Sequence, residues 1–294
     1  MTKIVLAGGT GFIGNYFRNH FQQMGYQVEM IARKAPAITW NDFQAMVEAL
    51  EGAEMVINLA GKSVNCRYHS RNRREILQSR IGTTKLLGDA IQACSQPPAL
   101  WINASTATIY RHAEDRPMTE VDGEIGTGFS VDVAAKWEQT FFQFQLPQTR
   151  QIALRIAIVL GPNGGVATPY KNLVTYGLGG PQGNGKQMFS WIHVDDLLHI
   201  VLFLRDHPQL KGVFNCSSPH PLTNDRLMKA LRSKLHRPIG LPTPKVLLEL
   251  GAVFLQTETE LILKSRWVLP KRLLDAGYTF RYPTIGQTLQ DIYR

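Results

Sequence analysis

Lys3-Ile4-Val5-Leu6-Ala7-Gly8-Gly9-Thr10-Gly11-Phe12-Ile13-Gly14 is the stretch that decides the fold of this chain. An apolar strand runs into a turn with glycines at G-x-x-G-x-x-G spacing. The first glycine permits the tight turn, the second lets backbone approach a pyrophosphate, and the third lets the following helix pack on the sheet. A diphosphate at that helix N-terminus meets free N–H groups and a favourable dipole. The stretch therefore predicts a dinucleotide site made by Gly8, Gly9, Thr10, Gly11, Phe12, Ile13 and Gly14.

Strand and helix patterns alternate through the first 160 residues. Strands are expected at 4–7, 27–32, 55–60, 100–104 and 152–159, and helices at 12–24, 42–50, 70–93 and 131–144. The strands are continuous apolar runs, which is typical of strands buried on both faces. The alternation predicts an α/β fold of the Rossmann type, a doubly wound parallel sheet with a smaller C-terminal substrate lobe.

Glycine and proline become frequent after Gly161. We expect residues 1–160 to form the dinucleotide-binding domain, with 190–217 returning to it. Residues 161–294 are expected to form a loop-rich substrate lobe and a small C-terminal domain. Further helices are expected at 194–205, 222–235 and 246–255 and after Thr284, with a short strand at 213–215.

Composition narrows the class of protein. With 294 residues, 44% of them hydrophobic, the chain can bury a full core. No apolar run is long enough to span a membrane, and the first strand begins by residue 3, which leaves no room for a signal peptide. The three cysteines, Cys66, Cys94 and Cys216, have no metal-binding spacing. These features predict a cytoplasmic protein without a disulfide framework, a metal or a membrane partner.

The net charge of +9 is partly local. Six basic residues lie in one short stretch: Arg67, His69, Arg71, Arg73, Arg74 and Arg80. They form either a solvated surface or an anion site for a phosphate-bearing cofactor or substrate. Nucleic acid is a disfavoured partner, because no aromatic-interleaved RNA motif accompanies the arginines.

The end of the second strand bears on cofactor choice. An acidic residue there binds the ribose 2′-hydroxyl of NAD, whereas an arginine accommodates the 2′-phosphate of NADP. Arg33 and Lys34 stand at that end, about 20 residues past Gly14, and Glu29 falls inside the strand. The pattern favours NADP(H) over NAD(H), unless both cations are ordinary surface residues.

Several blocks of sequence resemble one protein family. Together with the glycine turn, Asn58-Leu59-Ala60-Gly61, Lys136-Trp137-Glu138 and Gly177-Leu178-Gly179-Gly180-Pro181 resemble the extended short-chain dehydrogenase/reductase superfamily, more narrowly its atypical epimerase-family branch, also labelled cell-division inhibitors. The segment from Pro242 to Phe280 resembles the small C-terminal domain of that branch. The resemblance implies cofactor contacts at Leu59, Ala60, Gly61 and Ala104, and a homodimer.

The resemblance also implies catalytic residues. The superfamily uses a Ser or Thr, a Tyr and a Lys beside the nicotinamide. Here Thr106 and Tyr110 match the hydroxyl motif at the end of a strand, and Ser105 is an alternative hydroxyl.

The Tyr-x-x-x-Lys motif of the superfamily is missing. Its expected positions hold Ser130 and Ala134, and Lys136 is about 200° away around the helix. Either Tyr110 or another residue is the acid/base, or the protein binds NADP(H) without ordinary turnover.

The loop-rich half supplies candidate substrate contacts: Tyr176, Gln187, Trp191 and His193, with Arg80 from the basic stretch. His193 is either a proton-transfer group or the cap of the following helix. Two functions remain open. One is an NADP(H)-dependent oxidoreductase or epimerase acting on a small polar substrate, with an anionic substrate as one option. The other is a non-catalytic NADP(H) sensor or regulator whose basic surface could engage nucleic acid.

Overall fold

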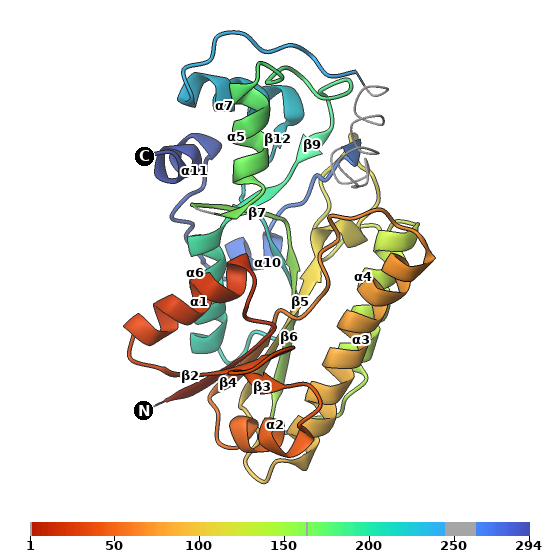
Figure 1. Ribbon diagram of the computed structural model, residues 1–294, viewed down its shortest axis with the longest axis vertical. Coiled ribbons are helices and arrows are strands. Elements are labelled where there is room, and N and C mark those ends of the chain that lie inside the picture. The colour runs from red at the N-terminus through yellow and green to blue at the C-terminus, as the bar shows by residue number, and fades with distance from the viewer. Residues whose placement is uncertain (1, 163, 245–262) are drawn as a thin grey trace.

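A seven-stranded, all-parallel sheet forms the centre of the molecule (Figure 1). The computed structural model describes residues 2–162, 164–244 and 263–294. The strand order is β11-β6-β5-β4-β1-β2-β3. The strands are β1 (Lys3–Ala7), β2 (Gln27–Ala32), β3 (Ile38–Thr39), β4 (Met55–Asn58), β5 (Leu100–Thr106), β6 (Arg150–Ile156) and β11 (Gly212–Cys216). Because the strands are parallel, their carboxyl ends meet at one edge of the sheet.

Helices cover both faces of this sheet. On one face lie α1 (Phe12–Gln23) and α6 (Val194–Asp206), and on the other α2 (Phe43–Leu50), α3 (Ser70–Ala93) and α4 (Phe129–Phe142) (Figure 1). Alternate residues of β1 feed the two cores: Ile4 and Leu6 pack in one, Val5 and Ala7 in the other. This double burial explains why the strands are continuous apolar runs. The expected doubly wound fold is confirmed.

A smaller lobe lies beyond the carboxyl ends of the strands (Figure 1). Its strands are β7 (Ile158–Gly161), β8 (Gly164–Gly165), β9 (Met188–Phe189), β10 (Trp191–His193) and β12 (Leu222–Thr223). Its helices are α5 (Ala167–Thr175), α7 (Asn224–Lys234) and α11 (Ile285–Ile292), whereas the short α10 (Lys271–Asp275) packs beside β11. No helix in the described ranges is both long and apolar enough to cross a membrane.

The structure differs from the sequence expectations in the second half. The strand expected at 152–159 is two strands, because β6 pairs with β5 and β11 whereas β7 pairs with β10 in a different sheet. Helix α5 forms where only loops were expected. The helix expected at 246–255 lies outside the described residues. The short strand expected at 213–215 is confirmed, since β11 joins the main sheet beside β6 from far along the sequence.

Candidate functional site

The three spaced glycines have three different environments at the β1–α1 turn. Gly8 has a φ of +76°, and a Cβ there would lie 2.4 Å from the Cα of Ala60. A Cβ on Gly14 would lie 2.3 Å from the Cα of Gly9. A Cβ on Gly11 would meet nothing within 4 Å, and Gly11 precedes α1 with no side-chain cap on the helix. A side chain at Gly8 or Gly14 would therefore clash with backbone, whereas the space beside Gly11 is free. The first N–H groups of α1 face this free space.

Backbone hydrogen bonds hold the ends of three strands together around this turn. Gly8 N donates to Ile31 O, and Leu59 N donates to Ala7 O, both at 2.8 Å. Ala60 N donates to Oδ1 of Asn58 at 3.0 Å. The expected cofactor residues at the glycine turn and at Leu59 and Ala60 are thus neighbours, at the edge where open α/β sheets bind ligands.

A buried polar cluster below these residues was not expected from the sequence. Asn58 Nδ2 donates to Oδ1 of Asn103 at 2.7 Å and to Oγ1 of Thr84 at 3.1 Å. Trp137 Nε1 also donates to Thr84 Oγ1, at 2.8 Å. The cluster ties β4 and β5 to α3 and α4, so it fixes the floor of the candidate site. Asn58 stood in a quoted motif, but nothing local in the sequence marks Asn103.

Arg33 and Lys34 follow β2 directly, and both are exposed. Neither forms an ion pair with a residue of the described ranges. Glu29 lies opposite Val5 inside the sheet, as expected. Two uncompensated cations therefore stand at the end of the strand next to β1.

Arg80 lies on α3 against the end of β4. Its Nη1 donates to the carbonyl oxygens of Lys62 at 3.1 Å and Ile76 at 3.0 Å. Its guanidinium carbon would lie 3.0 Å from a Cβ on Gly61. Burial lowers the pKa of Arg80 to about 10, and no carboxylate of the described residues pairs with it. Arg80 remains a cation at neutral pH, beside the expected cofactor residue Gly61.

Two other arginines of the basic stretch, Arg71 and Arg73, have partners of their own. Arg71 and Lys62 both pair with Glu75. The guanidinium of Arg73 lies 4.6 Å from the ring centroid of Phe129.

The two hydroxyls at the end of β5 have different roles. Ser105 is buried and donates to Oε1 of Glu138 at 2.6 Å. Thr106 is half-buried, and its Oγ1 accepts a hydrogen bond from Thr108 N at 3.1 Å. The Thr106 hydroxyl keeps its own proton for another acceptor, so Thr106 is better placed than Ser105 to hold a ligand oxygen. Ala104, an expected cofactor contact, directly precedes Ser105 in β5 and is 8% exposed.

Tyr110 lies in the core, which corrects the assignment of Tyr110 to proton transfer. Its ring is 1% exposed, and its hydroxyl donates to Oδ1 of Asn215 and accepts from Nη1 of Arg155, both at 2.9 Å. Burial raises the pKa of Tyr110, against the opposing charge of Arg155. With both hydrogen bonds made to protein groups and the residue 1% exposed, the Tyr110 hydroxyl is not placed to contact a substrate.

The four substrate candidates from the second half do not line one site. Tyr176 is 80% exposed at the end of α5, whereas Gln187 and Trp191 are buried. Trp191 packs in the core of the smaller lobe, and Gln187 Nε2 donates to the carbonyl of Gln182 at 2.9 Å. These positions correct the expectation that Gln187 and Trp191 contact a substrate.

His193 is the cap of α6 and not a surface acid. Its Nδ1 accepts from Asp195 N at 3.1 Å, its ring stacks on Tyr282 at 3.9 Å, and it is 1% exposed. Its Nε2 lies 3.3 Å from Oδ2 of Asp291 but without hydrogen-bond geometry. Burial lowers the pKa of His193, against the charge of Asp291. The capping interpretation is therefore correct, and the substrate role is not supported.

The C-terminal segment contributes residues that sequence reasoning missed. Lys264 Nζ donates to the carbonyl of Thr108 at 2.8 Å, and Arg266 Nε donates to Thr108 Oγ1 at 3.1 Å. Thr108 follows Thr106 at the end of β5. No local sequence signal could join residues more than 150 positions apart.

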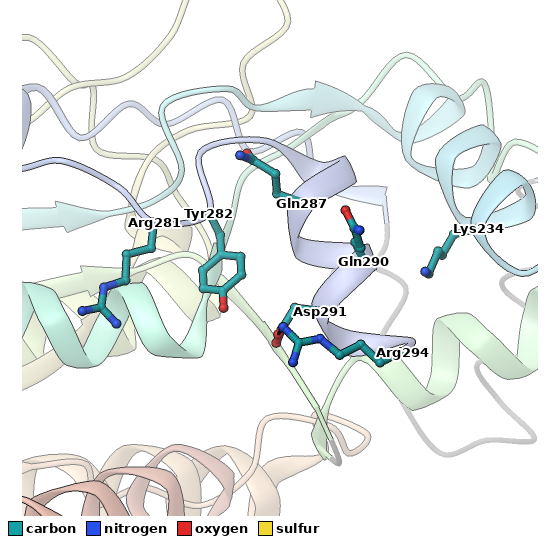
Figure 2. Close-up of a pocket in the computed structure, with 7 residues that line it drawn as sticks. All are labelled: Lys234, Arg281, Tyr282, Gln287, Gln290, Asp291 and Arg294. Carbon is teal, nitrogen blue, oxygen red and sulfur yellow. Dashed lines mark ion pairs between the residues drawn. The ribbon is translucent and has the colours of Figure 1, made fainter.

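An open pocket of about 400 Å³ lies elsewhere, between α7 and α11 (Figure 2). It is lined by Lys234, Arg281, Tyr282, Gln287, Gln290, Asp291 and Arg294. Arg281 pairs with Asp195 at 3.2 Å, and Arg294 pairs with Asp291 at 2.8 Å. These ion pairs compensate much of the positive charge that lines the pocket. None of the glycines of the β1–α1 turn lines it, and we place the candidate site at the turn.

Comparison with known proteins gives the following similarities. Residues 4–217 match the model of the NAD dependent epimerase/dehydratase family, and residues 243–292 match a domain of unknown function. The chain is 32% identical over 304 residues to an epimerase family protein, SDR39U1, of Bos taurus, covering 99% of both chains.

Two solved structures are similar over nearly the whole chain. The crystal structure of human epimerase family protein SDR39U1 with NADPH is 30% identical, covers 99% of both chains and has a TM-score of 0.91. A nucleoside-diphosphate sugar epimerase from Corynebacterium glutamicum is 26% identical with a TM-score of 0.79, over 99% of this chain and 58% of that one.

Proposed function

The chain belongs to the NAD dependent epimerase/dehydratase family, and we propose that it is an NADP(H)-dependent oxidoreductase or epimerase of the extended short-chain dehydrogenase type. Its substrate is a small polar molecule. We place its activity in the cytoplasm, in keeping with its three free cysteines.

The observation that carries the proposal is the open space beside Gly11. Gly8 and Gly14 are both packed against backbone, so their lack of a side chain has a structural cause. Gly11 has no such cause, since a Cβ there would meet nothing. Bare backbone at the N-terminus of α1 is the surface that a pyrophosphate requires.

NADP(H) is favoured over NAD(H) by Arg33 and Lys34. In this fold the adenosine ribose lies at the end of the second strand, where Arg33 and Lys34 stand. Neither residue has an ion-pair partner in the described ranges. An arginine fork binds a phosphate through two charge-assisted hydrogen bonds. The human relative whose structure contains NADPH is in keeping with this choice.

The chemistry follows from the edge of the sheet at which the cofactor would lie. When bound, the nicotinamide supplies or accepts a hydride. Thr106, at the end of β5, holds a substrate oxygen through its hydroxyl, and Arg80 adds a positive charge that suits a polar or anionic substrate.

Titration of the protein with NADPH and NADH tests the proposal. We expect saturable binding with a clear preference for NADPH, followed by oxidation of bound NADPH by one or more members of a panel of small carbonyl compounds. Failure to bind either cofactor would refute the proposal.

A non-catalytic NADP(H) sensor is the second candidate, and the burial of Tyr110 favours it. With that hydroxyl in the core, the hydroxyl motif at the end of β5 lacks its proton donor. Binding of NADPH without oxidation by any carbonyl compound would support this alternative.

A further inference from the structure

Arg80 is a half-buried cation that uses only one nitrogen of its guanidinium group in hydrogen bonds to the protein. Both bonds come from Nη1, which donates to the carbonyl oxygens of Lys62 at 3.1 Å and Ile76 at 3.0 Å. These bonds use the two N–H donors of Nη1. Nε and Nη2 donate to no group of the described residues. The N–H donors on Nε and Nη2 therefore remain for a ligand.

The two unused nitrogens of Arg80 keep contact with solvent. Buried side-chain atoms without a partner occur elsewhere in the described residues, for example Nε1 of Trp101 and of Trp191, but Nε and Nη2 of Arg80 are not among them. No carboxylate of the described part of the chain pairs with Arg80. Accessible N–H donors on a cation without a counter-charge are suited to bind an anion.

The guanidinium group of Arg80 is held in place by its neighbours. A Cβ on Gly61 would lie 3.0 Å from its carbon and 3.2 Å from Nη2, so the unused Nη2 lies directly beside this glycine. The centroid of the Trp137 ring lies 5.1 Å from the same guanidinium carbon. Trp137 is fixed in turn by its hydrogen bond to Oγ1 of Thr84 at 2.8 Å. A side chain that is already held loses little freedom when it binds a ligand.

Arg80 also lies close to the candidate cofactor site. Gly61 directly follows Ala60, and a Cβ on Gly8 of the glycine turn would lie 2.4 Å from the Cα of Ala60. The backbone that packs against the turn is therefore continuous with the backbone that packs against the guanidinium of Arg80.

The register of the sheet places Thr106 on the other side of Arg80. Strand β4 lies between β1 and β5, and Asn58 pairs with Asn103 at the end of β4. Gly61 and Thr106 each follow three residues after this pair, and neighbouring strands lie about 4.8 Å apart. A small ligand held by Thr106 would therefore lie close to Arg80.

The order of the strands also gives the direction of the cofactor. Arg33 at the end of β2 is assigned to the adenosine ribose, and the glycine turn after β1 to the diphosphate. The nicotinamide end would then continue toward β4 and β5, where Arg80 and Thr106 lie. An anionic group that meets Arg80 there belongs to the substrate.

We propose that Arg80 binds an anionic group of the substrate, a carboxylate or a phosphate, through the edge of its guanidinium that carries Nε and Nη2. The N–H bonds on that edge are parallel and match two oxygens of either group. This inference rests on the proposed function and deepens it, because it narrows a small polar substrate to a small anionic one. The diphosphate of the cofactor is the other source of the same chemistry, and the experiment distinguishes the two.

The first test follows Arg80 directly and needs no substrate. Protein labelled with ¹⁵N is saturated with NADPH, so that the glycine turn is occupied, and the arginine Nε–H signal that disappears in Arg80→Lys belongs to Arg80. We expect sodium acetate and inorganic phosphate each to shift this signal in a saturable way at millimolar concentration. Acetamide, which has the size of acetate but no charge, should not shift it. An Arg80 signal that neither anion moves would overturn the inference.

Variants show whether the effect belongs to this side chain. Phosphate affinity of the NADPH-saturated protein is read from the indole N–H signal of Trp137, and Arg80→Met should weaken it at least tenfold. Arg80→Lys keeps the charge but lacks the two-bond edge, so its affinity should be intermediate. Arg74→Met removes the same charge from an exposed position of α3 and should bind phosphate as wild type does. Equal weakening by Arg74→Met and Arg80→Met would overturn the inference.

Gly61→Ala gives the same information if Arg80→Met does not fold. Its Cβ would lie 3.0 Å from the guanidinium carbon and must displace it. Phosphate affinity should again fall, and an unchanged affinity in Gly61→Ala would contradict the site beside Gly61.

Affinity for NADPH distinguishes the two sources of the anion. Arg80→Met should bind NADPH within about threefold of wild type, since Arg80 is assigned to the substrate. A tenfold or greater loss of NADPH affinity in Arg80→Met would assign Arg80 to the cofactor diphosphate and refute its substrate role, while leaving the proposed function intact. A wild type that does not bind NADPH would refute the proposed function instead.

Discussion

Arg155 donates to the hydroxyl of Tyr110 at 2.9 Å while its other nitrogens pair with the carboxylate of Glu138 at 2.7 and 2.9 Å. Ser105 donates to the same carboxylate, and the Tyr110 hydroxyl donates to Asn215. The chain of bonds joins β5, α4, β6 and β11 below the candidate site. Tyr110 and Ser105, which looked catalytic from their spacing, therefore hold the scaffold together.

Breaking the buried ion pair should destabilise the fold strongly. Glu138→Ala leaves Arg155 without its carboxylate, and removing one partner of a buried pair costs about 3–5 kcal/mol. Urea unfolding followed by circular dichroism measures this free energy. Lys136→Ala, two residues away and exposed, should change it by less than about 0.5 kcal/mol. Equal stability of the two variants would contradict the structural role of Glu138.

Tyr110→Phe should affect stability and not catalysis. The substitution leaves Oδ1 of Asn215 and one N–H of Arg155 without a partner, at a cost of about 1–3 kcal/mol. Once the fraction of folded protein is taken into account, the NADPH oxidation rate should match wild type. A rate loss of a hundredfold or more in fully folded Tyr110→Phe would return Tyr110 to the active site.

The glycines of the turn should separate folding from binding. Gly11→Val has room for its side chain in the empty protein, so its circular dichroism should be that of wild type, whereas NADPH binding should fall at least a hundredfold. Gly14→Val should lose stability instead, because its Cβ would meet the backbone of Gly9. Gly286→Ala, at another open position, is the control and should bind normally. Normal calorimetric binding by Gly11→Val would sink the phosphate-cradle interpretation.

Arg33→Ala should reduce the preference for NADPH. Loss of a charged hydrogen-bonded contact costs about 1.5–3 kcal/mol, which is about a tenfold to 150-fold weaker affinity. NADH affinity should stay within about twofold of wild type, since NADH has no 2′-phosphate. An NADPH/NADH ratio that does not change would place Arg33 outside the site.

The fold could be predicted from the sequence because its signals are local. Residues close together in the sequence are enough to recognise the glycine spacing, the apolar strands and the continuous 70–93 helix. Strand β2 and helix α3 occupy the expected residues. The catalytic assignment depended on contacts that are not local. Tyr110 meets Arg155 and Asn215, which lie 45 and 105 residues further along the chain, so no window around Tyr110 could reveal its burial.

The burial of His193 could not be predicted from the sequence for the same reason. Its burial comes from Tyr282 and Asp291, which lie at and near α11 and cover it from the far end of the chain. The local signal that did survive was its position before two aspartates, which identified it as a helix cap.

The buried His193 should make stability fall in mild acid. Its native pKa is lowered by burial, so below the unfolded value of about 6.5 the unfolded chain takes up a proton that the native side chain resists. The contribution of His193 to the free energy of unfolding should therefore be complete above that pH. The free energy of unfolding should decrease as the pH falls from 7.5 toward 5.5. His193→Asn retains a side-chain acceptor that can cap α6 but does not titrate. Urea unfolding of both proteins across this range measures the difference, and wild type should lose more stability than His193→Asn on acidification. Parallel pH dependences would show that another group controls stability in this range.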